Sequence, residues 1–359
     1  RRNDNPVRMT GDGYVMAYEL GVPLVDMEFV QFLPTGSAEP GHPMFMLLLP
    51  PDLLEQVVLQ NAHGEDIVKK YGLDPRLAYS TQRDTWTIAI AREIYEGRGE
   101  DDTILLNLTK LPETLQRHRF IESLSETFKG FPLLTKPVHV TPLAHTFMGG
   151  IQIDENCNTP ILGLFAAGEV TGGIHGANRV GGNSLTECIV YGARAGKNAA
   201  DYAKKASGSQ IDMKHVEQKL QKVDDIVGRE PSNLGNPKLV RARIQEIMWK
   251  KAGAIRSQRS LTEAQDELSQ LKEENLSKIC GRSPPELMEA LEVTNLFLVA
   301  ALVVKAALAR EESRGVHYRA DCPRQDDQKW LKHIVLTKKL EGTEVGTCPV
   351  IMTKLFPEP

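Results

Sequence analysis

The run GLFAAGEVTGGIHGANRVGGNSLTEC fills positions 163–188 and is more informative than any other part of the chain. Its apolar beginning, Leu164–Ala167, predicts a strand that ends at Gly168 and Glu169. Five of the eleven residues at 172–182 are glycines, which let a backbone approach a ligand more closely than any residue with a Cβ atom. Asn183 and the next residues predict a helix that continues over 185–205. We therefore expect a strand, a loop around a ligand, and a helix.

The start of this helix indicates what kind of ligand would suit the loop. Ser184 and Glu187 have the spacing of a capping box, which predicts a well-defined helix N-terminus. Its free N–H groups and positive dipole end favour negative charge. A large planar cofactor that becomes anionic suits this place. The plainer interpretation is a glycine-rich surface turn.

Composition excludes several classes of protein. A chain of 359 residues with 41% hydrophobic and 25% charged residues is an ordinary globular sequence of two or three domains. A net charge of −4 and the lack of a basic block give no reason to expect a nucleic-acid partner. The longest apolar run, Leu296–Val304, is far shorter than the roughly 20 residues that span a bilayer. No signal peptide is visible, because no apolar segment follows the first residues.

Five cysteines are present, and they form no Cys-x-x-Cys pair. We therefore expect no zinc or iron–sulfur ligation within this chain and no bound metal. Free thiols in a reducing cytosol are the default interpretation.

Six segments match one protein family, and they occur in the order that the family has. They are TGDG at 10–13, DMEFVQF at 26–32, QRD at 82–84 with AREIYEGRG at 91–99, HTFMGG at 145–150, the run at 163–188, and ESRGVHY at 312–318. The chain thus resembles the flavoprotein subunits of succinate dehydrogenase and fumarate reductase, with L-aspartate oxidase as a close relative.

The resemblance implies a fold with three parts. We expect an α/β FAD-binding, Rossmann-like domain into which an α+β capping domain is inserted, followed by a C-terminal helical bundle domain. The FAD-binding domain would be N-terminally incomplete, because no Gly-x-Gly-x-x-Gly cradle opens a strand–turn–helix unit. The expected boundaries are 1–36 for part of the FAD-binding domain, 37–142 for the capping domain, 143–205 for the return to the FAD-binding domain, 206–318 for the helical domain and 319–359 for a tail.

Hydrophobic periodicity predicts the elements within these parts. Helices are expected at 14–20, 53–60, 84–96, 111–128, 214–227, 238–256, 261–279 and 285–310, and strands at 103–108, 139–143 and 150–154. The tail over 319–359 is expected to be irregular.

A flavin enzyme that forms or reduces an activated C=C bond needs a clamp for carboxylates and a proton donor opposite the flavin. Arginine and histidine suit the clamp, because both give charge-assisted hydrogen bonds to a carboxylate. The resemblance implies that Arg179 and His145 bind the substrate and that Arg83 transfers the proton. The plainer alternatives are a structural anchor for Arg179, a core histidine for His145 and a salt bridge at a helix start for Arg83. Asp84 is more plausible as a helix cap than as a relay.

The resemblance also implies which residues hold FAD. These are Asp12, Glu169, His175, Asn183, Ser184 and Leu185. The helix that Ser184 and Leu185 open would stabilise negative charge on the reduced flavin. Glu311, Arg314, His317 and Tyr318 match the family too, and we interpret them as a packing junction.

Two departures from the family concern the substrate. The family has a histidine where this chain has Leu33, and the Thr-Glu segment that follows in the family has no match in Met44–Asp52. Leu33 cannot donate a hydrogen bond, and the loss of one charge-assisted bond weakens binding by roughly 2–3 kcal/mol. A substrate with one carboxylate, or with an apolar second end, fits better than fumarate.

The leading hypothesis is an FAD-dependent oxidoreductase of the fumarate reductase/succinate dehydrogenase type, with a small carboxylate substrate and an iron–sulfur partner subunit. It would work in the cytoplasm and reach a membrane only through partner subunits. Two alternatives stay open: an L-aspartate oxidase-like enzyme, against which Gly181-Gly182 speaks, and a non-catalytic subunit that scaffolds a redox partner.

Overall fold

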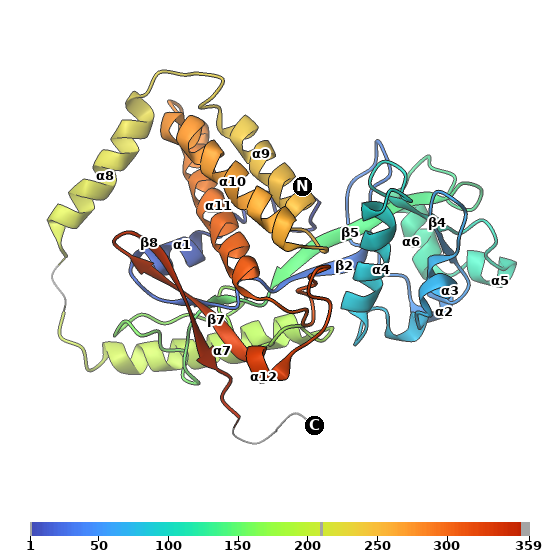
Figure 1. Cartoon of the computed structure of the whole chain (residues 1–359), viewed down its shortest axis with the longest axis horizontal. Coiled ribbons are helices and arrows are strands. Elements are labelled where there is room, and N and C mark those ends of the chain that lie inside the picture. The colour runs from blue at the N-terminus through green and yellow to red at the C-terminus, as the bar shows by residue number, and fades with distance from the viewer. Residues whose placement is uncertain (1, 209–210, 353–359) are drawn as a thin grey trace.

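The computed structural model describes residues 2–208 and 211–352, so positions 353–359 of the expected tail lie outside it. Figure 1 shows a smaller lobe on one side of a larger body. Two long strands, β2 (Val30–Ser37) and β5 (Val138–Phe147), run from the body into the lobe. They cross the positions at which we placed the capping-domain boundaries, and the boundaries themselves stay a prediction.

The smaller lobe is built on a four-stranded antiparallel sheet in the order β2-β5-β4-β3, with β4 at Ile104–Asn107 and β3 at Val58–Gln60. Its helices are α2 (Pro51–Leu54), α3 (Ile67–Tyr71), α4 (Arg83–Tyr95), α5 (Glu113–Gln116) and α6 (Arg119–Thr127), with a 3-10 turn at Pro75–Leu77. Trp86 and Phe128, both fully buried, lie in the core of this lobe.

Two helix predictions in this lobe are wrong in part. The helix expected at 53–60 ends at Leu54, and β3 follows it, because Val58 and Leu59 pair with β4. The helix expected at 111–128 is divided into α5 and α6. His118 follows the end of α5 and is the N-cap of α6, since its ring nitrogen accepts a hydrogen bond from the N–H of Phe120.

A second antiparallel sheet lies in the body, in the order β6-β1-β7-β8. Its strands are β6 (Gly150–Ile151), β1 (Leu24–Val25), β7 (Lys332–Lys339) and β8 (Gly342–Pro349). The prediction of an irregular tail is therefore wrong over 332–349, where a hairpin forms. Ile334 and Leu336 alternate toward the core, and pairing with β1 fixes the register.

The run at 163–188 also differs from expectation in two respects. Leu164–Ala167 forms no strand, because its one β-bridge, between Asn158 and Phe165, does not extend into a ladder. The following helix, α7 (Asn183–Ala203), has Gly182 as its N-cap, in the left-handed region at φ 84°. Ser184 lies inside the first turn and Glu187 pairs elsewhere, so the expected capping box is absent.

The four helices predicted after α7 are present, although two of them end five residues before the expected 256 and 279, and a short helix is added in the tail. They are α8 (Met213–Gly228), α9 (Pro237–Lys251), α10 (Gln258–Glu274), α11 (Pro284–Ala309) and the short α12 (Asp327–Trp330), with a 3-10 turn at Leu276–Lys278. α9, α10 and α11 pack around a shared core that includes Ile244, Leu268 and Val293. α8 has no buried residue and stands apart at one side of Figure 1.

α11 is long and apolar enough to cross a membrane by length and composition alone. It packs against α9, α10 and α1 (Asp12–Glu19), and its residues contribute to two cores. We interpret α11 as the central helix of the body.

Candidate functional site

Two buried arginines from distant parts of the chain meet at the start of α4. Arg83, the first residue of that helix, is 4% exposed. Its Nη1 donates to Oε1 of Gln31 at 2.9 Å, and its Nη2 donates to the carbonyl of Tyr79 at 2.7 Å. Gln31 in turn donates from Nε2 to the carbonyl of Arg179 at 2.9 Å. One buried amide therefore links Arg83 to the glycine-rich loop that carries Arg179.

The two guanidinium groups carry positive charge that the protein leaves largely uncompensated. In the described part of the chain neither forms an ion pair with a carboxylate, and the Nε atoms of both are buried without a hydrogen-bond partner. Burial, and then the nearby charge of Arg179, lowers the pKa of Arg83 to about 10. Burial also lowers the pKa of Arg179, against which Glu169 and Glu187 act. Such a pair is suited to binding an anion.

The glycine loop reaches this pair because Gly181 has no side chain. A Cβ atom at that position would lie 2.8 Å from the carbonyl oxygen of Tyr79 and 3.2 Å from Nη2 of Arg83. Gly182 follows with φ 84°, a conformation that side chains disfavour. The two glycines therefore set both the approach of the loop to Arg83 and the start of α7.

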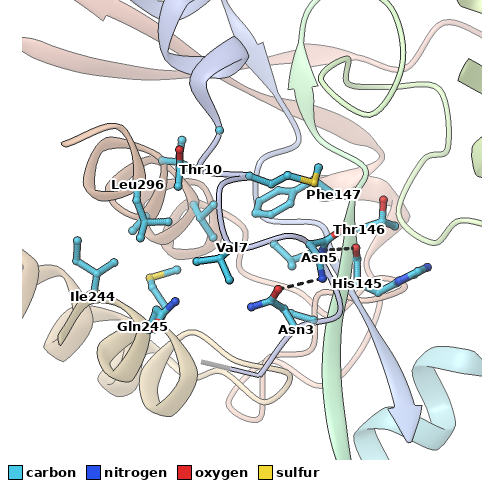
Figure 2. Close-up of a pocket in the computed structure, with 18 of the residues that line it drawn as sticks. Asn3, Asn5, Val7, Thr10, His145, Thr146, Phe147, Ile244, Gln245 and Leu296 are labelled. Atoms are coloured by element: carbon cyan, nitrogen blue, oxygen red, sulfur yellow. Dashed lines mark hydrogen bonds between the residues drawn. The ribbon is translucent and has the colours of Figure 1, made fainter. Parts of the chain in front are cut away.

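His145 lies in a neighbouring cavity of about 850 Å³, which is drawn in Figure 2. Its Nδ1 is 2.9 Å from Oδ2 of Asp4, and its carbonyl accepts a hydrogen bond from the side chain of Asn5. Asp12 and Glu169 line the same cavity, whereas Arg83 and Arg179 do not. The expected site residues therefore lie in two adjoining groups. Arg83 and Arg179 form one group, and His145, Asp12 and Glu169 form the other.

Asp12 and Glu169 are held by hydrogen bonds from several elements. Oδ1 of Asp12 accepts from Thr10 Oγ1 at 3.0 Å and from Asn295 Nδ2 at 2.8 Å. Oε1 of Glu169 accepts from the N–H of Phe147 at 3.0 Å. Glu169 also acts on the charge of Arg179, which connects the cavity to the arginine pair.

The start of α7 is open. No side chain caps it, and Asn183 and Leu185 in its first turn are exposed, with Ser184 half-buried between them. His175 Nε2 lies 3.4 Å from Oε2 of Glu187, whose other oxygen is buried without a partner. Free N–H groups at this end and orphaned polar atoms beside it fit the polar, anionic edge of a flavin.

Sequence reasoning missed Gln31, Asn178 and Tyr79. All three lie in or next to quoted motifs, but only the tertiary structure shows that their polar atoms contact the arginines or each other. Gln31 Nε2 also donates to Oδ1 of Asn178 at 2.9 Å. The signal available in the sequence was a glutamine in the middle of an apolar strand.

From the Met44–Asp52 segment, which lacks the Thr-Glu of the family, the carbonyl of Leu47 joins Thr35 and Tyr79 in a small uncharged group next to Arg83. Thr35 Oγ1 donates to the carbonyl of Leu47 at 2.5 Å and lies 3.1 Å from the hydroxyl of Tyr79. Burial raises the pKa of Tyr79 to about 12. Leu33, two residues after Gln31 on β2, is fully buried and adds an apolar side chain.

Comparison with known proteins finds two family models that match this chain, one in its N-terminal half and one in its C-terminal third. The model of the FAD binding domain matches residues 4–185, and that of the fumarate reductase flavoprotein C-terminal region matches 241–359. The chain belongs to the fumarate reductase/succinate dehydrogenase flavoprotein family. The expected fold class, with its FAD-binding and C-terminal helical domains, is confirmed.

Individual relatives are similar over nearly the whole chain. The fumarate reductase (CoM/CoB) of Methanothermobacter marburgensis has a subunit that is 38% identical over 351 residues, which cover 95% of this chain and 62% of the relative. The fumarate reductase flavoprotein subunit of Escherichia coli is 33% identical over 96% of this chain and 60% of its own length. The chain thus spans about three fifths of these relatives.

A solved structure extends the likeness to three dimensions. The quinol fumarate reductase flavoprotein of Escherichia coli superposes with a TM-score of 0.87 at 31% identity, and the match covers 100% of this chain and 65% of the Escherichia coli chain.

Across residues 2–208 and 211–352, no cluster of three His, Cys, Asp or Glu side chains could hold a metal ion.

Proposed function

We propose that the protein is an FAD-dependent oxidoreductase that acts on a C–C bond next to a carboxylate, as fumarate reductases and succinate dehydrogenases do. One observation supports this most strongly. Arg83 and Arg179 are buried together, they are joined through Gln31, and no carboxylate of the described residues pairs with either. Two such cations beside a cofactor cradle suit a substrate anion and the negative charge that develops on it.

The FAD would lie against the open N-terminus of α7, with Asn183, Ser184 and Leu185 at its polar edge. Glu169, Asp12 and His175 would bind other polar groups of the cofactor. When bound, FAD supplies or accepts the hydride of the reaction. The α7 N–H groups stabilise negative charge at this end without any movement of the protein.

The residues of the chain would bind the substrate and move its proton. Arg179, with His145 from the neighbouring cavity, binds the carboxylate, and Arg83 holds a proton on its guanidinium opposite the hydride. A pKa of about 10 makes Arg83 a better acid than a free arginine, because burial and Arg179 disfavour its charge. Gln31 and Tyr79 fix its position, so the proton is delivered to one carbon.

The substrate class follows from Leu33. Because this side chain is buried and apolar, two residues after Gln31 on β2, it offers no hydrogen bond to a second carboxylate. We propose a monocarboxylic enoate, or a substrate with an apolar second end, rather than fumarate. The relatives are named as subunits, and we propose that an iron–sulfur subunit exchanges electrons with the flavin and that any membrane contact is made through partners. The cytoplasmic location stays a prediction.

Anaerobic turnover tests this function. The intact protein, loaded with FAD, is mixed with reduced methyl viologen, and the oxidation of the dye is followed with crotonate or with fumarate. We expect a higher kcat/KM for crotonate and no turnover in Arg83→Ala. Bound flavin without turnover of either enoate would contradict the enzyme and favour the scaffold, and a protein that stays colourless with added FAD would favour it further.

The L-aspartate oxidase alternative is tested by release of hydrogen peroxide with L-aspartate. Gly181 argues against it, because the Ala-Ser that we associate with the oxidase would bring a Cβ atom to 2.8 Å from the Tyr79 carbonyl.

A further inference from the structure

Gln31 occupies a place that no apolar strand requires. It lies on β2, is fully buried, and uses both ends of its amide. Oε1 accepts from Arg83, and Nε2 donates to the carbonyl of Arg179 and to Oδ1 of Asn178, each at 2.9 Å. Arginine can only donate, so the oxygen must face Arg83 and the NH₂ group must face the glycine loop. The orientation of the amide is thus fixed from both sides.

The chemical nature of this side chain also matters. A glutamate has the same shape, but its carboxylate would form an ion pair with Arg83. It also has no N–H group to donate to the Arg179 carbonyl. A neutral amide holds the guanidinium in place and leaves its charge available. Gln31 therefore fixes the position of the Arg83 guanidinium and also leaves its positive charge unpaired.

We propose that Gln31 is a positioning residue that fixes the distance between the proton donor Arg83 and the carboxylate-binding Arg179, and whose neutrality keeps both cations available to the substrate. The inference rests on the proposed function. It adds that an amide from β2 helps to hold α4 and the glycine loop, which contribute one arginine each, in register.

Two substitutions separate the holding role from the charge. Gln31→Met keeps the length and removes the hydrogen bonds, so Arg83 is no longer fixed. Since a misplacement of about 1 Å can cost a factor of about 100, we expect kcat for crotonate to fall roughly 100-fold with KM changed by less than about 5-fold. Gln31→Glu adds a carboxylate beside Arg83. We expect KM to rise about 100-fold and the alkaline limb of the pH–rate profile to move to higher pH, because a neighbouring negative charge favours the protonated guanidinium.

Ser37→Ala is the matched control. Ser37 is a fully buried polar residue on the same strand, and its hydroxyl has no partner. We expect wild-type kcat, KM and pH profile in this variant. Thermal unfolding of all three variants shows whether each is folded before its kinetics are compared.

Binding distinguishes failure of this inference from failure of the proposed function. Crotonate is titrated calorimetrically into the protein with oxidised FAD, which cannot reduce it. If wild type binds crotonate but turns over no enoate, the proposed reaction is wrong. The role of the neutral amide in anion binding is then supported by about 100-fold weaker binding in Gln31→Glu with less than about 5-fold change in Gln31→Met. Equal losses of binding in both folded variants, or wild-type kcat in Gln31→Met where turnover exists, would overturn the inference. Absence of binding by wild type would overturn both.

Discussion

The Nδ1 atom of His333 lies 2.6 Å from Oδ2 of Asp26, although 307 positions separate them in the sequence. Asp26 follows β1 directly, with a positive φ of 58°, and His333 belongs to β7. The pair joins the hairpin near the end of the chain to the turn that leads into β2. It lies beside the glycine loop, since a Cβ atom at Gly173 would be 4.0 Å from the His333 ring. The pair thus connects β7 to the turn before β2, next to the candidate site.

This pair predicts a pH dependence of stability. The hydrogen bond that His333 donates to Asp26 raises the pKa of His333, with burial and Arg310 acting against it and Glu28 with it. The contribution of the pair is present in full below the ordinary histidine pKa of about 6.5 and is lost as pH rises through the higher folded value. We expect His333→Gln to cost about 1 kcal/mol at pH 6 and much less at pH 9. The free energy of unfolding in urea measures this, and an equal cost at both pH values would contradict it.

A buried ion pair between Glu28 and Arg310 predicts a large effect on stability. Oε1 of Glu28 lies 2.7 Å from Nε of Arg310, and both side chains are fully buried. Burial raises the pKa of Glu28 to about 7, with Arg310 opposing. Glu28→Ala removes this pair but leaves Arg310 with Glu312, 3.0 Å away, so we expect a loss of about 3 kcal/mol in the free energy of unfolding. Lys339→Ala, which breaks the exposed pair with Glu344, should cost less than about 1 kcal/mol.

Gly181→Ala tests the approach of the glycine loop to Arg83. The new methyl group would lie 2.8 Å from the Tyr79 carbonyl, so loop and guanidinium must separate. We expect kcat for the enoate to fall at least 10-fold. Gly192→Ala is the control, because that position lies inside α7 with nothing within 4 Å, and alanine there should stabilise the helix by about 0.5–1 kcal/mol. Unchanged kinetics in both variants would argue against a tight loop.

Arg83→Lys tests proton transfer separately from anion binding. Lysine keeps a positive charge but cannot make both hydrogen bonds to Gln31 and Tyr79. We expect kcat to fall by about 10²–10⁴ while crotonate binding weakens by no more than about 10-fold. If kcat stays within about 3-fold of wild type, another group must deliver the proton.

Leu33→His tests the substrate class. A histidine at this position of β2 can donate a hydrogen bond to a second carboxylate. The ratio of kcat/KM for fumarate to that for crotonate should rise about 10-fold or more, which corresponds to about 1.4 kcal/mol. Leu33→Met, similar in volume and apolar, should leave the ratio unchanged. A ratio that stays the same in a folded Leu33→His variant would show that this position does not face the substrate.

Particular elements show where sequence reasoning sufficed. The 3.6-residue periodicity predicted α4, which buries one side along its length, and the apolar composition marked α11, whose buried residues contribute to two cores. It failed for β3 and the β7–β8 hairpin, because a strand is stabilised by a partner far away in sequence. Ile334 and Leu336 alternate as strand residues do, but only β1 provides the edge on which they pair.

The candidate site divides in the same way. The sequence by itself determined the family and the cofactor class, because six motifs match the family in order. The same motifs predicted Arg83, Arg179 and Glu169 as site residues. Only the tertiary structure decided that Gln31 links the two arginines, that Gly182 and not Ser184 is the N-cap of α7, and that His145 lies in the adjoining cavity. The physical reason is range: spacing along the chain specifies local backbone, whereas hydrogen bonds between buried side chains depend on which distant elements pack together.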